Sequence, residues 1–249
     1  LVRSRGLGDV YKRQSNKVVA APVIWSREVT KGKLVRAAVL NSGGANACTG
    51  PKGFADTHDT AEKVADLLGI SSGEVVVCST GLIGELLPMP KIFSGLESIA
   101  TVLKSDSLDD VSRAIMTTDS VPKVATVSIS GVEFVGIAKG AGMLAPALAT
   151  MLSVVMTDAV LPQNAQEIFS RVADRTYNRI DSDGCTSTND TVLLMGSGAS
   201  SVSLSDVEFE SALMEVCGSL AAQLIADAEG STKTVAITIK GAATEEDAV

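Results

Sequence analysis

Two β-like runs that follow one another closely constrain the fold more than any other feature of the sequence. The runs KVATVSIS (123–130) and VEFVGIA (132–138) are separated only by Gly131. A connection this short can join antiparallel strands as a hairpin, whereas parallel strands need a crossover of a dozen or more residues. The sequence therefore predicts a sheet that is partly antiparallel in the middle of the chain.

Strand-like and helix-like patterns alternate through the rest of the chain. Runs rich in β-branched and apolar residues predict further strands at 17–26, 33–42, 74–80, 152–159, 191–197 and 233–240. Amphipathic spacing predicts helices at 55–68, 92–104, 109–118, 162–180 and 206–230. Pro162 is expected near the first turn of its helix. The mixed order of predicted strands and helices, the hairpin and the long helices favour an α+β fold over a purely parallel doubly wound sheet.

The charge balance argues against nucleic-acid and membrane partners. With 29 acidic and 21 basic residues the formal net charge is -8, and no basic stripe offsets it. The most apolar run, 143–156, is shorter than the roughly 20 residues of a membrane helix, which indicates core. The four cysteines form no CxxC pair, which favours scattered thiols in a reducing cytosol over disulfides or a zinc site: Cys48, Cys78, Cys185 and Cys217.

The first 14 residues do not fit the rest of the chain. The string LVRSRGLGDVYKRQ (1–14) is basic but lacks the apolar region of a signal peptide. It resembles translated adapter sequence and shares no apolar periodicity with the run that follows. We expect residues 1–14 to be non-native and exclude them from functional reasoning.

A G-x-G-x-x-A motif at Gly140, Gly142 and Ala145 follows a predicted strand, as a dinucleotide fingerprint would. The motif has this meaning only where a helix follows, and Pro146 interrupts the start of any such helix. The sequence therefore disfavours nicotinamide or flavin binding.

A second glycine-rich stretch, NSGGANACTG (41–50), could cradle an anion, but it lacks the Lys-Ser/Thr ending of a P-loop. Taken alone, it indicates a tight loop with positive φ at Gly43 or Gly44.

Histidine-based acyl chemistry has a single candidate. His58 is the only histidine, and it lies between Asp56 and Asp59 on a polar helix face, where a solvated side chain is the better interpretation. A threonine at a new chain N-terminus offers another route, because its own α-amine, with a pKa of about 8, can serve as the base. Thr150 then becomes a candidate, although a threonine between apolar neighbours is more often a core residue.

The chain from about Asn16 to Val249 resembles the glutamate N-acetyltransferase (ornithine acetyltransferase) family. Six motifs carry the resemblance, in the order of the family: NSGGANACTG, STGLIGELLPM, MTTDSVPK, AKGAGMLAPALATML, DGCTSTNDTVLL and DAEGSTK. The resemblance implies self-cleavage between Ala149 and Thr150, with Thr150 as the nucleophile. It also implies ping-pong transfer of an acetyl group from N2-acetyl-L-ornithine to L-glutamate through an acetyl-Thr150 ester. Some members also use acetyl-CoA, which the sequence does not decide.

The resemblance also implies roles for further residues. Thr80 and Gly81 match the family's oxyanion-hole positions. Thr117, Lys139, Thr150 and Glu229 match its substrate-contact positions, with Thr118 as a neighbouring alternative to Thr117. Lys139 can pair with a carboxylate and Glu229 with an ammonium.

The resemblance implies an α/β/β/α sandwich forming one catalytic domain over 15–249, with an α chain to Ala149 and a β chain from Thr150. It further implies an α2β2 assembly in the cytoplasm that requires no metal or organic cofactor. Relatives continue past Val249 into a closing segment, so a C-terminal part is expected to be missing here. Two alternatives stay open: a self-cleaving aminopeptidase-type hydrolase of the related fold, and a nucleotide-binding module that uses Gly140 and Gly142.

Overall fold

The computed structural model describes residues 2–3, 8–11, 17–145, 148–149, 151–244 and 246–248. Its strands are β1 (Val2–Arg3), β2 (Gly8–Tyr11), β3 (Ala37–Gly44), β4 (Val75–Leu82), β5 (Lys123–Ile129), β6 (Val132–Lys139), β7 (Leu144–Ala145), β8 (Leu148–Ala149), β9 (Leu152–Thr157) and β10 (Thr191–Gly196). Its α-helices are α1 (Ala21–Lys31), α2 (Gly50–Leu68), α3 (Met89–Ala100), α4 (Leu108–Ala114), α5 (Ala165–Arg175) and α6 (Asp206–Ala226). Short 3-10 turns lie at Ser72–Glu74, Tyr177–Arg179 and Glu246–Ala248.

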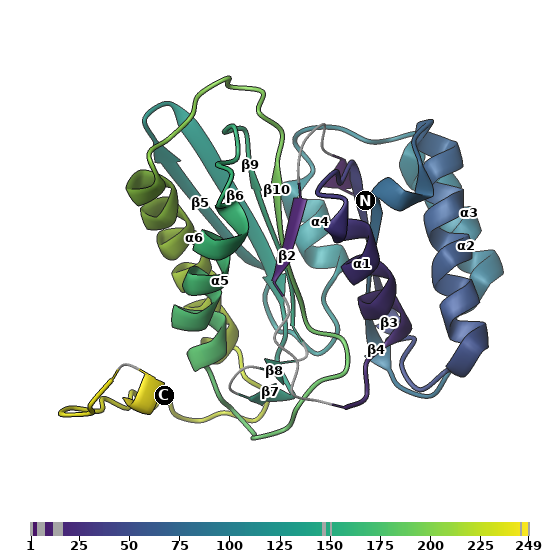
Figure 1. Cartoon of the computed structure of the whole chain (residues 1–249). Coiled ribbons are helices and arrows are strands. Elements are labelled where there is room, and N and C mark those ends of the chain that lie inside the picture. The colour runs from purple at the N-terminus through teal and green to yellow at the C-terminus, as the bar shows by residue number, and fades with distance from the viewer. Residues whose placement is uncertain are drawn as a thin grey trace.

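Two sheets stack between two layers of helices (Figure 1). The larger sheet has the order β2-β10-β9-β6-β5, and the smaller has the order β1-β3-β4. Helices α5 and α6 cover the outer face of the larger sheet, and α2 and α3 cover the outer face of the smaller one. A separate apolar cluster fills the space between the sheets, with contributions from α1 and α4. This layering is the α/β/β/α sandwich of an α+β fold.

The predicted hairpin forms between β5 and β6. The strands pair in antiparallel register from Lys123 opposite Ala138 to Ile129 opposite Val132. Ser130 and Gly131 both have positive φ, of 51° and 80°, as a two-residue turn matched to the strand twist requires. The larger sheet is mixed, because β9 pairs antiparallel with β6 and parallel with β10.

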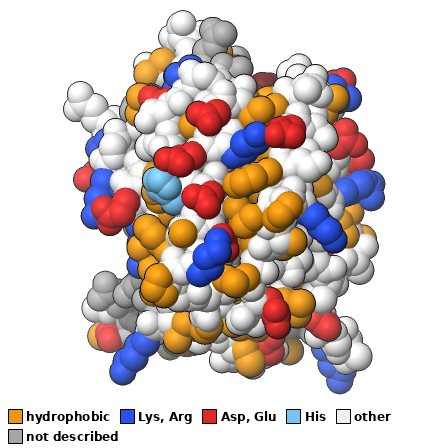
Figure 2. Space-filling model, turned by 90° about the vertical axis from the view of Figure 1, so that its right-hand side faces the viewer, with side chains coloured by type: hydrophobic (Ala, Val, Ile, Leu, Met, Phe, Trp, Pro, Cys, Tyr) orange, Lys and Arg blue, Asp and Glu red, His pale blue; other side chains and the backbone are white. Residues whose placement is uncertain are grey.

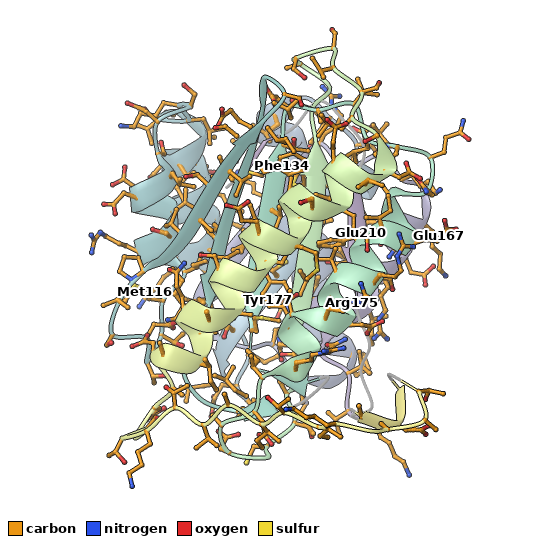
Figure 3. The ribbon with its side chains drawn as sticks, turned by 90° about the vertical axis from the view of Figure 1, so that its left-hand side faces the viewer. Met116, Phe134, Glu167, Arg175, Tyr177 and Glu210 are labelled. Atoms are coloured by element: carbon orange, nitrogen blue, oxygen red, sulfur yellow. The ribbon has the colours of Figure 1, made fainter. Side chains whose placement is uncertain are left out.

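Helix α6 shows how the outer layer is held. A capping box of Ser205 and Glu208 begins the helix. Phe209 then packs edge to face on Phe134 of β6, with ring centroids 5.5 Å apart. Figure 3 shows α6 lying across the larger sheet, with Phe134 labelled. The helix is long and apolar enough to cross a membrane by length and composition. Its fully buried residues face the sheet instead, so α6 is a core helix in this fold: Phe209, Leu213, Val216, Cys217, Leu220 and Leu224.

The prediction of a strand at 17–26 is wrong, because the structure has helix α1 from Ala21 to Lys31. Pro22 occupies the first turn, where its fixed φ favours a helix and its missing N–H costs nothing. Val23, Ser26 and Val29 are buried at a spacing of three residues, a helical period that becomes visible only when the run is followed beyond Ser26.

The prediction of a strand at 233–240 is also wrong. The segment has no strand pairing in the described structure and is exposed throughout, with Ile237 84% exposed. The alternation of apolar residues is present, but a strand also needs a neighbouring strand for its backbone groups. In Figure 1 this segment runs away from the body of the molecule toward the C-terminus.

Helix α5 begins at Ala165, three residues after Pro162, whose carbonyl accepts a hydrogen bond from the Ala165 N–H. Within residues 1–14, the described backbone of β1 pairs with β3 and that of β2 with β10. The assignment of residues 1–14 as non-native stays a prediction.

Candidate active site

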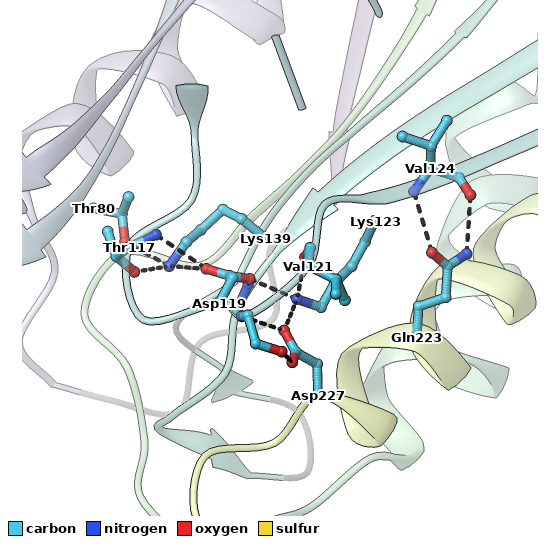
Figure 4. A network of polar contacts seen from close by, with 11 residues as sticks. Thr80, Thr117, Asp119, Val121, Lys123, Val124, Lys139, Gln223 and Asp227 are labelled. Carbon is cyan, nitrogen blue, oxygen red and sulfur yellow. Dashed lines mark hydrogen bonds and ion pairs between the residues drawn. The ribbon is translucent and has the colours of Figure 1, made fainter. Parts of the chain in front are cut away.

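A buried lysine lies at the centre of the candidate site. Lys139 is the last residue of β6 and is 1% exposed. Its Nζ donates to Thr117 Oγ1 at 2.7 Å and to Thr80 Oγ1 at 3.3 Å, and lies 3.6 Å from the Asp119 carboxylate (Figure 4). The end of β6, the end of β4 and the loop after α4 therefore converge on one ammonium group.

Burial lowers the pKa of the Lys139 ammonium below its ordinary value, and the carboxylates of Asp119 and Asp190 oppose this shift without reversing it. Because an ammonium can only donate, both threonine hydroxyls act as acceptors toward it and keep their own protons for donation. The cluster thus presents two hydroxyl donors polarised by a neighbouring positive charge. Such a group can bind a carboxylate or stabilise a developing oxyanion.

The backbone at Thr80 and Gly81, near the end of β4, is fixed by its neighbour in the smaller sheet. Gly81 has φ 128° and pairs with Gly43, whose φ is 121°. A Cβ at Gly81 would overlap the Gly43 carbonyl and lie 2.7 Å from the Gly44 nitrogen. The expectation of positive φ at Gly43 or Gly44 is confirmed at Gly43. A Cβ at Gly43 would meet no atom within 4 Å, so its backbone conformation alone favours glycine there, whereas Gly81 is restricted by both its φ and the close backbone approach.

A polar side chain in the segment that leads into β10 links parts of the same region by hydrogen bonds. Asn189 Nδ2 donates to the carbonyls of Ala45 at 2.6 Å and Ser79 at 2.9 Å, and it is buried. The Ser79 hydroxyl donates to Asn41 Oδ1 at 2.6 Å. These bonds join three of the sequence motifs, 41–50, 79–89 and 183–194, at one end of the sheets.

Glu229 reaches the site through the chain that leaves α6. Its backbone N–H donates to the Ala141 carbonyl at 2.6 Å. One of its carboxylate oxygens lies 3.1 Å from the position that a Cβ would take at Gly142. Glu229 is exposed and therefore borders the site beside the loop that follows Lys139.

The predicted nucleophile, Thr150, lies outside the described residues. Its neighbours are described: Ala149 pairs with Leu144 in the two-stranded sheet of β7 and β8, and Met151 is buried. The Met151 N–H donates to Asp190 Oδ1 at 3.0 Å, and the Met151 carbonyl accepts from the Thr191 N–H at 3.0 Å. Asp190 thus holds the peptide after position 150, and the same carboxylate acts electrostatically on Lys139.

The structure brings together Thr80, Thr117 and Lys139, and it gives the contact with Lys139 to Thr117 rather than to Thr118. Sequence reasoning missed Asp119 and Asp190. Both lie in motifs that had already been singled out, MTTDSVPK and DGCTSTNDTVLL. An aspartate among apolar strands and small polar residues was the signal that could have found them.

The other sequence candidates lack the surroundings that their alternative roles require. No helix follows Gly140 and Gly142 within the described residues, since β7 begins at Leu144, so the dinucleotide context is missing. His58 lies on α2, where Nε2 is 3.6 Å from Glu62 and the ring packs on Trp25. Figure 2 shows the histidine, in pale blue, at the surface among acidic side chains. His58, Asp59 and Glu62 could approach one ion, but the two carboxylates are exposed, as solvated acidic groups on helices commonly are.

Comparison with known sequences identifies the relatives of this chain. The sequence model of the ArgJ family matches residues 10–249. The chain belongs to the ArgJ family. It is 56% identical over 236 residues to the arginine biosynthesis bifunctional protein ArgJ of Streptomyces avermitilis. This match covers 94% of this chain and 62% of the relative. It is 53% identical over 235 residues to the ArgJ protein of Thermobifida fusca, covering 94% of this chain and 61% of that relative.

The chain thus spans about three fifths of the length of these ArgJ relatives. Among solved structures it is similar to the Mycobacterium tuberculosis ornithine acetyltransferase complexed with ornithine, at 43% identity with a TM-score of 0.49. That match covers 57% of this chain and 77% of the other. The Bacillus halodurans ArgJ structure matches at 35% identity, also with a TM-score of 0.49, covering 61% and 78%.

Proposed function

We propose that the complete gene product is an acetyltransferase of arginine biosynthesis. It moves the acetyl group of N2-acetyl-L-ornithine to L-glutamate after cleaving itself between Ala149 and Thr150. The observation that carries the proposal is the convergence of Thr80 and Thr117 on the buried ammonium of Lys139, beside the aspartate that accepts the Met151 N–H. Membership of the ArgJ family and the names of the relatives support it.

Self-cleavage would begin with attack of Thr150 Oγ on the Ala149 carbonyl carbon. The C–N bond of the scissile peptide breaks, its nitrogen takes the hydroxyl proton, and the acyl group moves to oxygen as an ester. Water then hydrolyses the ester, which leaves a free carboxylate on Ala149 and a free α-amine on Thr150. This amine provides a base next to the hydroxyl, so the reaction needs no histidine.

Acetyl transfer would reuse the same hydroxyl. Thr150 Oγ attacks the acetyl carbonyl, its proton passes through the α-amine to the departing ornithine nitrogen, and an acetyl ester remains. The amine of L-glutamate then attacks this ester and regenerates the hydroxyl. Each tetrahedral intermediate carries an oxyanion, for which the Thr80 hydroxyl and the Gly81 backbone N–H are the donors in this proposal.

The charges around the site suit substrates that are amino acids. Lys139, with the Thr117 hydroxyl, offers a site for a carboxylate, and Glu229 offers one for an ammonium. Ornithine and glutamate both carry an α-carboxylate, so the same pair can serve both half-reactions. We place the enzyme in the cytoplasm as an α2β2 assembly of the two cleavage products.

The test uses the protein from the complete reading frame. We expect two fragments on a denaturing gel, one uncut chain for Thr150→Ala, and acetyl transfer from N2-acetyl-L-ornithine to L-glutamate. Acetyl-CoA is assayed in parallel as a second donor, because the relatives are called bifunctional. Peptide hydrolysis without an acceptor would favour the aminopeptidase-type alternative, and an uncut wild type that transfers acetyl groups would disprove the threonine mechanism.

A further inference from the structure

We infer that Lys123 is a positioning residue for substrate binding: it joins the buried carboxylate of Asp119 to the half-buried carboxylate of Asp227, and these hold three substrate-binding segments in place. The inference rests on the proposed function, because it deepens the account of the same site. It concerns a residue next to the site that does not itself reach the proposed substrate positions.

Lys123 begins β5 and has a fully buried side chain. Its Nζ donates to Asp119 Oδ1 at 2.7 Å, to Asp227 Oδ2 at 2.6 Å and to the Val121 carbonyl at 3.3 Å (Figure 4). An ammonium has three protons, so all its donors are used within the protein. Lys123 therefore has no donor left for a substrate and acts through its two carboxylate partners.

Asp119 connects Lys123 to the loop that contains Thr117 and to the end of β6. It accepts the Thr117 N–H at 3.1 Å and the Gly140 N–H at 2.6 Å, and it lies 3.6 Å from Lys139 Nζ. One carboxylate thus fixes the backbone of Thr117, the backbone just after Lys139 and the Lys139 charge. A shift of Asp119 would displace both side chains proposed to bind the substrate carboxylate.

Asp227 connects Lys123 to the segment that contains Glu229. It accepts the Ser120 N–H at 3.0 Å and the Ser120 hydroxyl, which ties the end of α6 to the residue after Asp119. Two residues later the Glu229 N–H donates to the Ala141 carbonyl. The segment that contains Glu229 is thus hydrogen-bonded at two points, Asp227 and Glu229 itself, to the segments that contain Thr117 and Lys139.

The charges of this network balance. Lys123 and Lys139 supply two positive charges, and Asp119 and Asp227 supply two negative charges in a region with little solvent. Removal of Lys123 alone leaves two carboxylates near each other with one cation, so Lys139 must compensate for the missing charge. We expect its ammonium to move toward Asp119 and away from the Thr80 and Thr117 hydroxyls.

Gln223 provides a matched structural control. It also joins α6 to β5, donating to the Val124 carbonyl at 3.0 Å and accepting the Val124 N–H at 3.2 Å (Figure 4). The contact lies one residue from Lys123 but reaches none of the proposed substrate-binding segments. Its loss should therefore loosen the same pair of elements without moving Thr117, Lys139 or Glu229.

The experiment measures steady-state kinetics and calorimetric binding of ornithine for the complete protein, its Lys123→Met and Lys123→Arg variants, and Gln223→Ala. For Lys123→Met we expect KM and the ornithine Kd to rise at least about tenfold while kcat changes less than about threefold, because the segments that Lys123 holds contain the groups proposed to bind the non-reacting charges of the substrate, and loss of such uniform binding raises KM without lowering kcat. Lys123→Arg should recover part of the affinity. Gln223→Ala should leave both constants within about twofold, since it touches no binding segment.

A folded Lys123→Met protein with wild-type affinity would overturn the inference, as would an equal loss of affinity in Gln223→Ala. If Lys123→Met does not fold, Asp227→Asn tests the same network, with a smaller rise in Kd expected and an unchanged Kd overturning the inference. A wild type that binds ornithine but transfers no acetyl group would refute the proposed function alone. A wild type that binds no ornithine would refute both.

Discussion

The carboxylate of Asp190 accepts a hydrogen bond from the backbone N–H of Met151, with 3.0 Å between Oδ1 and nitrogen. This contact fixes the peptide that directly follows the proposed nucleophile. We predict that Asp190→Ala slows self-cleavage by about 10- to 100-fold, because a hydrogen bond to a charged group contributes about 1.5–3 kcal/mol. Gel densitometry of the uncut chain over time measures the rate.

Asp158→Asn is the control for that experiment. Asp158 also accepts a backbone N–H, that of Glu133 at 2.9 Å, but it lies beyond the other end of β9. Its substitution should leave the cleavage rate unchanged. Equal rates for Asp190→Ala and the wild type would show that the Met151 contact does not position the bond.

Gly81→Ala should destabilise the protein by about 2 kcal/mol or more, because alanine would be strained at φ 128° and its Cβ would overlap the backbone at Gly43. Gly84→Ala is the matched comparison. Gly84 also has positive φ, of 88°, but no atom lies within 4 Å of the position of its Cβ. Urea unfolding of both variants should give the larger loss for Gly81, and equal losses would contradict the close approach.

The stability difference between the wild type and Asp227→Asn should depend on pH. Burial raises the pKa of Asp227, but the hydrogen bonds from Lys123 and Ser120 outweigh it, so the pKa lies below the ordinary 3.8. The stabilisation from the charged carboxylate is therefore fully present above pH 3.8 and is lost as the pH falls through the lowered folded-state pKa. Urea midpoints across the acid range measure it, and a difference that stays constant would contradict the shift.

The four cysteines should separate into two classes under a water-soluble maleimide. Burial raises the pKa of Cys217 to about 12, and Cys78 is also buried, whereas Cys48 and Cys185 are exposed. Because the thiolate is the reactive form, only Cys48 and Cys185 should be labelled in the folded protein at mildly alkaline pH. Peptide mass spectrometry identifies the sites, and labelling in urea, where all four should react, serves as the control.

Ile237→Lys should change the free energy of unfolding by less than about 0.5 kcal/mol, because the side chain is 84% exposed. Leu213→Ala, in the buried face of α6, should cost about 2–5 kcal/mol. Urea unfolding of the two variants checks the contrast. A large loss for Ile237→Lys would mean that the 233–240 segment is packed in solution.

Local patterns in the sequence predicted the elements that are specified locally. The hairpin at Gly131 and helix α6 have turn and capping residues that act over a few positions, and both formed as expected. The strand predicted at 17–26 was wrong because the run was cut before its helical period could show. The strand predicted at 233–240 was wrong because pairing depends on a partner that the run itself does not contain.

Part of the candidate site could also be predicted from the sequence, and part could not. Resemblance to a family pointed to Thr80, Thr117 and Lys139, which the fold brings into contact. The pair formed by Lys123 and Asp227 was not predictable, because the two residues are 104 positions apart and each is an ordinary charged residue in its own segment. Which charges become buried together is decided by the packing of α6 on β5, and a single sequence does not state it.

Strands β6 and β9 are neighbours in the larger sheet, paired from Phe134 opposite Thr157 to Lys139 opposite Leu152, although one precedes position 149 and the other follows it. A cut at that position would therefore leave two polypeptides interlocked through one set of backbone hydrogen bonds. They would migrate as one particle in gel filtration and separate only in denaturant. Recovery from denaturant would then require two molecules to meet, so its rate should rise with protein concentration, unlike that of the uncut chain.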